Sequence, residues 1–244
     1  MKRSHFLKDY TYGLRRALPI MFGFLPVAIT FAVMSTQAGL SVGETIAMSA
    51  GVFAGASQIM AVGMVGAGAD VFSITVATLV LNLRHIIMST CVFRRLTNEK
   101  KRWYLPIGFG VTDETFAFFS LEKSDRASVG YMLGLITVAY SSWVGGTALG
   151  AFVSGVLPTT VADSLGIALY ALFIALVTPD VAKSLRLLLV VAFTAILNTV
   201  LCLLLPQSWA IIAATLTGAL VGVFLAEDRD VGMMVEDAVE GGRV

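Results

Sequence analysis

Long apolar runs follow one another along almost the whole chain. Hydrophobic residues make up 57% of the sequence and charged residues only 14%, whereas an average soluble domain is about 25% charged. A helix that crosses the bilayer core needs about 20 mostly apolar residues, and most runs approach that length. We therefore expect an all-α polytopic membrane protein with a single transmembrane domain over residues 1–244. The apolar segments are residues 18–37, 45–65, 71–93, 104–120, 131–155, 161–178, 185–205 and 208–226.

The basic residues predict which side of the membrane each loop faces. Positive loops stay in the cytoplasm, and the two densest basic clusters are residues 1–17 and residues 94–102. Three segments separate these clusters, so one of the three should enter and leave on the same side. Segment 45–65 fits best because the run Gly51–Gln58, GVFAGASQ, interrupts it with small and polar residues. Non-helical backbone at that depth must be buried in protein or line a polar cavity.

Segment 104–120 is expected to cross from the cytoplasmic cluster at 94–102 to the outside. The loop that contains Lys123 and Arg126, balanced by acidic neighbours, then lies outside.

The second half of the chain follows the same reasoning. Lys183 and Arg186 lie in the cytoplasm only if segment 161–178 also fails to cross, and its uninterrupted apolar part is short for a span. The basic segment 1–17 and the acidic tail 227–244 are then both cytoplasmic.

Weak internal similarity accompanies this topology. The stretch that begins at Glu44 resembles the one that begins at Asp163. We therefore expect two inverted repeats, residues 18–120 and residues 131–226, each with three transmembrane helices and one broken re-entrant segment. Interrupted segments at matching positions of inverted repeats indicate the binding site of a transporter. The alternative is eight simple spans with parallel repeats.

The run Gly55–Gln58 is the first polar group at membrane depth. A half-helix that starts near Ser57 would offer free amides and the positive end of its dipole to a carboxylate. Packing of small residues between helices, with Ser57 bonded to its own backbone, is the alternative.

Asn82, Arg84 and His85 form the second group, inside segment 71–93. Arg84 could pair with a substrate carboxylate or with an acidic side chain on a neighbouring helix. Snorkelling of Arg84 to the interface is the alternative. His85 could carry protons near neutral pH.

Asp113 and Glu114 form the third group, in VTDETF. Adjacent residues point to different faces of a helix, so the two carboxylates need different partners. Either could couple transport to protons, and an ion pair with Arg84 competes with that role. Asn198, which matches Asn82 in the repeat, is the fourth group, and on its own it predicts an interhelical hydrogen bond.

Several functional classes are excluded by the sequence. It has no Walker loop and no cluster of residues with the spacing of metal ligands, so we expect no enzyme, no cofactor and no metal site. The net charge of +1 leaves no basic surface for nucleic acid.

Three strings occur in a characteristic order: AGLSVGETIAMSAGVFAGASQ (38–58), LNLRHIIMS (81–89) and TDETFA (112–117). They resemble the AzlC-like branched-chain amino-acid permeases, the large subunits of two-component bacterial exporters, and the likeness extends to ALYALFIALV (168–177). The resemblance implies secondary active export of leucine, isoleucine and valine, with methionine often included, across the inner membrane. It also implies a small AzlD-like membrane subunit, and it leaves a homo-oligomer open.

The chain departs from the common family pattern at two places. Arg94 and Arg95 stand where the family often has a proline-containing turn, and Ile59 replaces a common phenylalanine. The family label assigns no roles to the polar residues.

We expect the broken segment to receive the substrate carboxylate, and Phe53 and Phe173 to accept the branched side chain. A passive channel and a non-transporting assembly subunit are the alternatives to an exporter.

Overall fold

The computed structural model describes residues 3–96, 100–123, 126–155 and 184–225, with isolated residues at 174, 178, 181 and 182. All regular secondary structure among these described residues is helical. Most of segment 161–178, including Phe173, and the tail 227–244 lie outside the described residues. The helices are α1 (Arg3–Arg16), α2 (Leu18–Gln37), α3 (Val42–Val52), α4 (Gly55–Gly66), α5 (Val71–Asn82), α6 (Arg84–Arg95), α7 (Tyr104–Gly110), α8 (Asp113–Ser120), α9 (Val129–Val153), α11 (Leu185–Leu204) and α12 (Gln207–Leu225), with a 3-10 turn η1 (Lys101–Trp103) before α7.

Several helices are long and apolar enough to cross a membrane. Within the described residues these are Leu18–Gln37, Val71–Arg95, Val129–Val153 and Leu185–Leu204. The second of them combines α5 and α6, which are separated by Leu83 alone, and Leu83 keeps a right-handed helical conformation. The all-helical membrane architecture that the composition predicts is therefore present.

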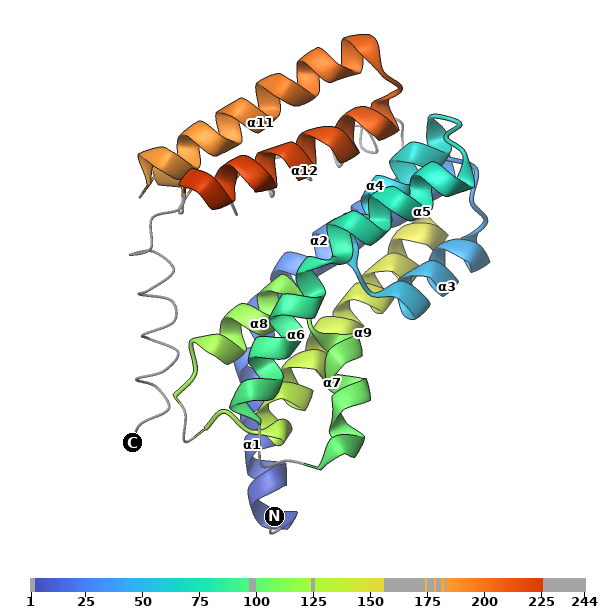
Figure 1. The fold of residues 1–244 in the computed structure, drawn as a ribbon. Coiled ribbons are helices and arrows are strands. Elements are labelled where there is room, and N and C mark those ends of the chain that lie inside the picture. Colours follow the sequence, from blue (N-terminus) through green and yellow to red (C-terminus); the bar gives the residue numbers. More distant parts are fainter. Residues whose placement is uncertain are drawn as a thin grey trace.

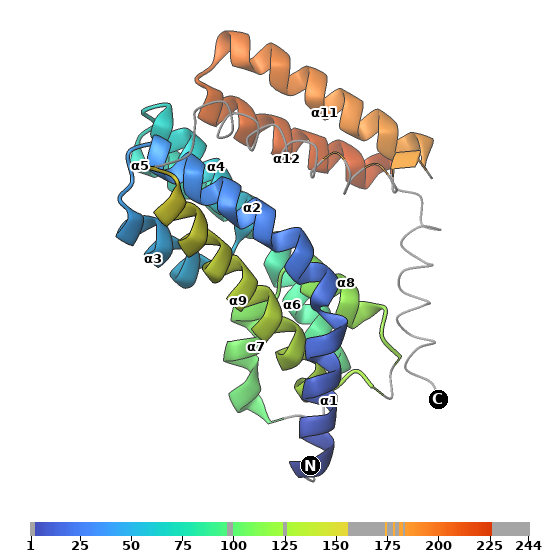
Figure 2. The same cartoon turned by 180° about the vertical axis from the view of Figure 1, so that it is seen from behind.

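α1 and α2 follow one another along a single side of α9 (Figures 1 and 2). Glycines allow this close approach, since a Cβ on Gly134 would lie 2.9 Å from the Cα of Gly13, and one on Gly150 would lie 2.8 Å from the Cα of Ile29. Small residues at such contacts are typical of helix packing in membranes. The earlier residue of α9, Gly134, contacts Gly13, and the later residue, Gly150, contacts Ile29. The α1–α2 segment and α9 therefore run in the same direction, so α2 and α9 are parallel.

α3 and α4 form a hairpin that turns back near the middle of α2. The turn is made by Phe53, whose backbone has the left-handed angles φ 46 and ψ 44, a conformation that costs a residue with a Cβ about 1–2 kcal/mol. Burial of its ring offsets this cost, because Phe53 packs 5.1 Å from the ring of Tyr140 and 6.5 Å from that of Phe24. α4 then returns to the end of α2, where Gly66 lies beside Ala38. The interruption predicted within segment 45–65 is thus present.

α7 and α8 form a second hairpin, which turns back from the opposite end of the molecule. α7 begins after Trp103, whose ring stacks on that of Phe6 in α1, 5.9 Å away. The chain leaves the helical conformation at Val111 and Thr112. α8 then returns, so that the ring of Phe119 lies 6.2 Å from that of Tyr131 near the start of α9.

This second hairpin corrects the prediction that segment 104–120 crosses the membrane. The physical cause is a capping box: the hydroxyl of Thr112 accepts from the N–H of Thr115, and the hydroxyl of Thr115 accepts from the N–H of Thr112 at 2.8 Å. Such a box starts a new helix and interrupts the apolar run. The loop with Lys123 and Arg126 therefore lies at the same end as α1, not at the opposite end.

The parallel course of α2 and α9 also corrects the assigned repeats. These helices open residues 18–120 and 131–226, and inverted repeats would require them to run in opposite directions. The helix bounds indicate a shorter inverted repeat instead. One constant separation in residue number relates four pairs of helix ends. These pairs are the ends of α3 and α7, the starts of α4 and α8, the starts of α5 and α9, and the ends of α6 and α9. The second member of each pair runs opposite to the first. The end of α2 and the end of α6 have the same separation, so α5–α6 belongs to both units.

α11 and α12 form an antiparallel pair that Figure 1 shows at the top of the view, with one end of α12 next to α5. Thr194 lies beside Gly218. α12 contacts α5, where the ring of Trp209 lies 6.4 Å from that of Phe72 and Ile212 packs in a cluster with Ala77. The apolar window of α11 has no buried residue among those described, as expected of a helix that faces lipid.

Candidate functional site

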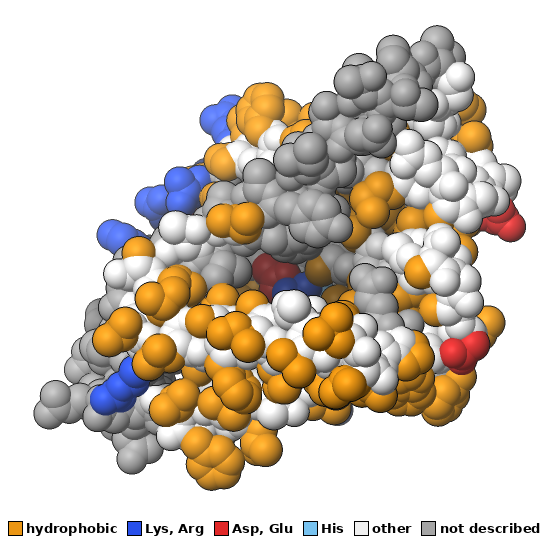
Figure 3. All heavy atoms as spheres, turned by 90° about the horizontal axis from the view of Figure 1, so that it is seen from above, with side chains coloured by type: hydrophobic (Ala, Val, Ile, Leu, Met, Phe, Trp, Pro, Cys, Tyr) orange, Lys and Arg blue, Asp and Glu red, His pale blue; other side chains and the backbone are white. Residues whose placement is uncertain are grey.

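A cavity of about 680 Å³ lies where the two hairpins meet beside α2 and α6. Its wall includes the first turns of both returning helices, α4 and α8, and it is closed by aromatic side chains of α2 and α9. The space-filling view in Figure 3 shows a hollow in the surface with acidic and basic side chains at its floor. Six of the residues that line the cavity were predicted from the sequence as site residues: Phe53, Gly55, Arg84, His85, Asp113 and Glu114.

The first turn of α4 presents backbone donors to this cavity. The N–H groups of Gly55, Ala56 and Ser57 have no acceptor inside the helix, and Gly55 and Ala56 line the cavity. The helix has no acidic residue in its first turn and no side-chain cap at Ala54. This positive helix end is therefore not neutralised by its own side chains.

Arg84 and Asp113 form an ion pair at the cavity wall. Nη1 of Arg84 lies 2.8 Å from Oδ2 of Asp113, and the side chains are 38% and 48% exposed. Nε of Arg84 is buried and has no hydrogen-bond partner among the described residues. Of the partners that the sequence leaves open for Arg84, the structure thus selects Asp113 over Glu114, and one edge of the guanidinium keeps a free donor.

Glu114 and His85 also line the cavity. The carboxylate of Glu114 makes no ion pair with a described residue, since Asp113 occupies Arg84. Nδ1 of His85 lies 3.2 Å from the carbonyl oxygen of Asn82, so a neutral imidazole that donates there leaves Nε2 unprotonated. Asp113 thus pairs with Arg84 whereas Glu114 does not, so the two adjacent carboxylates have different surroundings, as their helix positions predict.

Ser57, Gln58 and Asn82 lie behind the wall rather than in it. Nδ2 of Asn82 donates to the hydroxyl of Ser57 at 3.1 Å, and that hydroxyl donates to the carbonyl of Ala54 at 3.0 Å. Oε1 of Gln58 accepts from the N–H of Ala54 at 3.1 Å and from Nε1 of Trp143 at 3.1 Å. These bonds fix the interruption before α4 to α5 and α9.

Aromatic side chains form the apolar part of the cavity. Trp143 packs 5.5 Å from Phe24, and Phe24 packs 6.5 Å from Phe53. Ile59 of α4 adds an aliphatic surface. Sequence reasoning missed Phe24 and Trp143, because an aromatic residue in a long apolar helix gives no signal of its own.

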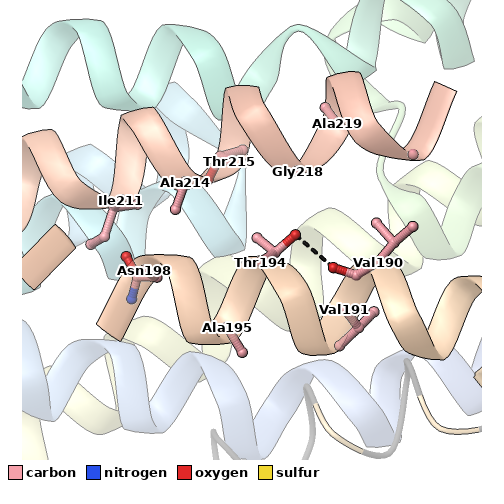
Figure 4. A pocket seen from close by; sticks show the side chains of 11 residues that line it. Val190, Val191, Thr194, Ala195, Asn198, Ile211, Ala214, Thr215, Gly218 and Ala219 are labelled. Carbon is pink, nitrogen blue, oxygen red and sulfur yellow. Dashed lines mark hydrogen bonds between the residues drawn. The ribbon is translucent and has the colours of Figure 1, made fainter. Parts of the chain in front are cut away.

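The structure does not bring Asn198 to this cavity. Asn198 lies on α11 and faces a separate groove of about 560 Å³ between α11 and α12. Figure 4 shows this groove, in which the side chains of Asn198 and Ile211 lie opposite each other and the hydroxyl of Thr194 bonds to its own helix at Val190. No ionisable side chain is among the described residues that line it. Asn198, which the proposed repeat matches to Asn82 and which the sequence placed in the substrate site, therefore does not line this cavity.

The fold and the cavity together define a helical membrane protein with charged groups at interrupted helices, an arrangement typical of transporters. The chain belongs to the AzlC family: the model of this family, described as AzlC protein, matches residues 19–157.

Three relatives illustrate this membership. The inner membrane protein YgaZ of Escherichia coli K12 is 30% identical over 224 residues, which cover 88% of this chain and 89% of YgaZ. A membrane protein of Archaeoglobus fulgidus is 36% identical over 170 residues, or 69% of this chain and 74% of the relative. The branched-chain amino acid transport protein AzlC of Bacillus subtilis is 26% identical over 152 residues, or 61% of this chain and 59% of the relative. No solved structure matches the chain.

Proposed function

We propose that the protein exports branched-chain amino acids, with methionine included, across the bacterial inner membrane by secondary active transport. A small AzlD-like membrane subunit acts with it. Membership of the AzlC family and the name of the Bacillus subtilis relative support the substrate class. The observation that carries the proposal is the cavity, which offers separate contacts for the carboxylate, the ammonium group and the apolar side chain of one amino acid.

The carboxylate binds at the first turn of α4. The free amides of Gly55 and Ala56 and the positive helix end favour an anion, and Arg84, which lines the same cavity, adds a positive charge. The first turn of α8, the counterpart of α4 in the inverted repeat, holds its own acidic residues, Asp113 and Glu114. The two helix ends therefore differ, and only that of α4 is open to an anion.

The ammonium group binds to Glu114. Asp113 is engaged by Arg84, so Glu114 is the carboxylate at the wall that remains for a cation or a proton. His85 lines the same cavity as Glu114, and its imidazole is the second group there that can carry a proton. Coupling to a proton gradient follows from these two groups.

The apolar side chain packs against Phe24, Phe53, Ile59 and Trp143, all of which line the cavity. An aliphatic chain gains about 0.8 kcal/mol for each CH₂ that it buries. These contacts favour leucine, isoleucine and valine over polar amino acids.

The N-terminus lies in the cytoplasm, whereas the cytoplasmic position of the tail 227–244 stays a prediction, since that tail lies outside the described residues. Between residues 17 and 93 the sequence has a single basic residue, Arg84, and between residues 127 and 182 it has none. The loops at the far end of α2 and α9 thus carry no positive charge, whereas Arg95 and Arg126 lie at the end where α1 begins. The positive-inside rule makes that end cytoplasmic.

Reconstitution tests the proposal against a channel and an assembly subunit. Proteoliposomes that contain this chain together with its small partner should accumulate leucine above its external concentration when an ion gradient is imposed. A passive channel would only equalise the two concentrations. An assembly subunit would be shown by full transport with the partner alone. Absence of transport of every branched-chain amino acid would contradict the proposal.

A further inference from the structure

Trp143 stands in the middle of α9 and contacts both the cavity and the interruption before α4. Its indole is only 2% exposed. Phe24 packs edge-on to it at 5.5 Å, and Phe31 stacks on it at 5.9 Å. Both phenylalanines belong to α2, so two helices determine where the ring lies.

A hydrogen bond fixes the ring to α4. Nε1 of Trp143 donates to Oε1 of Gln58, and the same oxygen accepts the N–H of Ala54. Gln58 is fully buried. Without the indole donor, Gln58 would keep a single bond at this oxygen, and α4 would lose its hydrogen bond to α9 next to its first turn.

Gly55 of α4 lies directly against the ring. A Cβ at this position would lie 2.8 Å from Cη2 of Trp143 and 3.3 Å from Cζ2, which is closer than packed carbon atoms lie. The benzene part of the indole therefore covers the Cα of Gly55, and no side chain fits between them.

We propose that Trp143, placed against Gly55, determines the size of the side chain that the cavity accepts. This inference rests on the proposed function, because it assumes that an amino acid binds with its carboxylate at the first turn of α4. A branched aliphatic side chain that extends from this point meets the indole. An aromatic side chain needs the space that the indole occupies and is rejected.

The substitution Trp143→Phe separates this role from a general role in folding. Phenylalanine places its ring near the pyrrole part of the indole, vacates the space beside Gly55 and retains the contacts with α2. We expect the ratio of kcat/KM for phenylalanine to that for valine to rise about tenfold or more, the range in which apolar pockets discriminate by size. A purely structural loss would lower transport of both substrates by the same factor.

The substitution Gly55→Ala gives the matched control. Alone, it should reduce transport because its Cβ collides with the indole. In the Trp143→Phe background the Cβ enters vacated space, so the double variant should transport more than Gly55→Ala alone and should return the ratio towards the wild-type value. Such non-additivity is expected of residues in contact. Trp209→Phe, at the contact between α5 and α12, should leave the ratio unchanged.

The outcomes distinguish this inference from the proposed function. If the wild-type protein transports leucine but the ratio is unchanged in a normally abundant Trp143→Phe variant, the inference is overturned and the function stands. If the wild-type protein transports no branched-chain amino acid, both are wrong. If Trp143→Phe does not accumulate, Gly55→Ala carries the test, and an unaltered preference between leucine and valine in that variant overturns the inference.

Discussion

The ion pair between Arg84 and Asp113, 2.8 Å from Nη1 to Oδ2, connects the long helix α5–α6 to the first turn of α8. The pair joins a spanning helix to a hairpin, so a movement of the hairpin α7–α8 away from α6 would lengthen or break it. Both residues line the cavity. The pair therefore joins the wall of the cavity to the hairpin α7–α8.

Replacement of Arg84 by alanine should lower kcat/KM for leucine about 100-fold or more, because loss of a hydrogen bond from a charged group costs about 1.5–3 kcal/mol and the charge of Asp113 is left unpaired. Arg84→Lys should retain part of the activity, since it keeps the charge but not the planar fork. Transport assays at matched protein abundance measure both. Wild-type rates for Arg84→Ala would show that Arg84 has no part in transport.

Glu114→Gln should raise KM for leucine about tenfold or more, since the ammonium group loses a charged partner worth about 1.5–3 kcal/mol. Inhibition of transport by 4-methylpentanoate, which is leucine without its amino group, should not change. Competition assays give both values. Equal effects on the two compounds would place Glu114 away from the ammonium group.

Cysteine labelling tests the two hairpins. A cysteine at Ala67, an exposed position after α4, should react with an impermeant maleimide added outside cells. A cysteine at Lys123, after α8, should react only from the cytoplasmic side, because segment 104–120 turns back. Cys91 and Cys202 are both exposed and are first replaced by serine. External labelling at Lys123 would show that segment 104–120 spans the bilayer.

Arg95 caps the end of α8, where its guanidinium donates to the carbonyls of Phe119 at 2.7 Å, Ser120 at 2.9 Å and Glu122 at 2.7 Å. Arg95→Gln should lower Tm by roughly 4–8 °C, from a loss of about 2 kcal/mol. Arg94→Gln removes the same charge from an exposed neighbour and provides the control. Equal Tm values for the two variants in detergent would contradict the capping role.

The sequence predicts the first hairpin but not the second. GVFAGASQ is visibly interrupted, and its small residues are present at the turn around Phe53. In segment 104–120 the run length hides the break, although Thr112 followed by two acidic residues is a recognisable helix start. The wrong side for Lys123 and Arg126 followed from that omission, since a count of crossings propagates a single error to every later loop.

The candidate site was also predicted only in part from the sequence. Arg84 at depth predicts a partner, because an unpaired charge in the membrane is costly, and the structure supplies Asp113. Trp143 and its bond to Gln58 could not be predicted, since the residues belong to helices far apart in the sequence and only the packing of α9 beside α4 brings them together. The shorter inverted repeat is expressed in helix bounds rather than in residue identities, so sequence similarity did not reveal it.

The central claim is that an amino acid binds in the cavity with its carboxylate at the first turn of α4. A single cysteine at Ala56, which lines the cavity, tests it through the rate of alkylation of the purified protein. The account predicts that leucine slows alkylation and that leucinol, which has no carboxylate, does not, while alkylation of a cysteine at Ala67 is unaffected by either. An alkylation rate at Ala56 that is unchanged by saturating leucine would contradict the account.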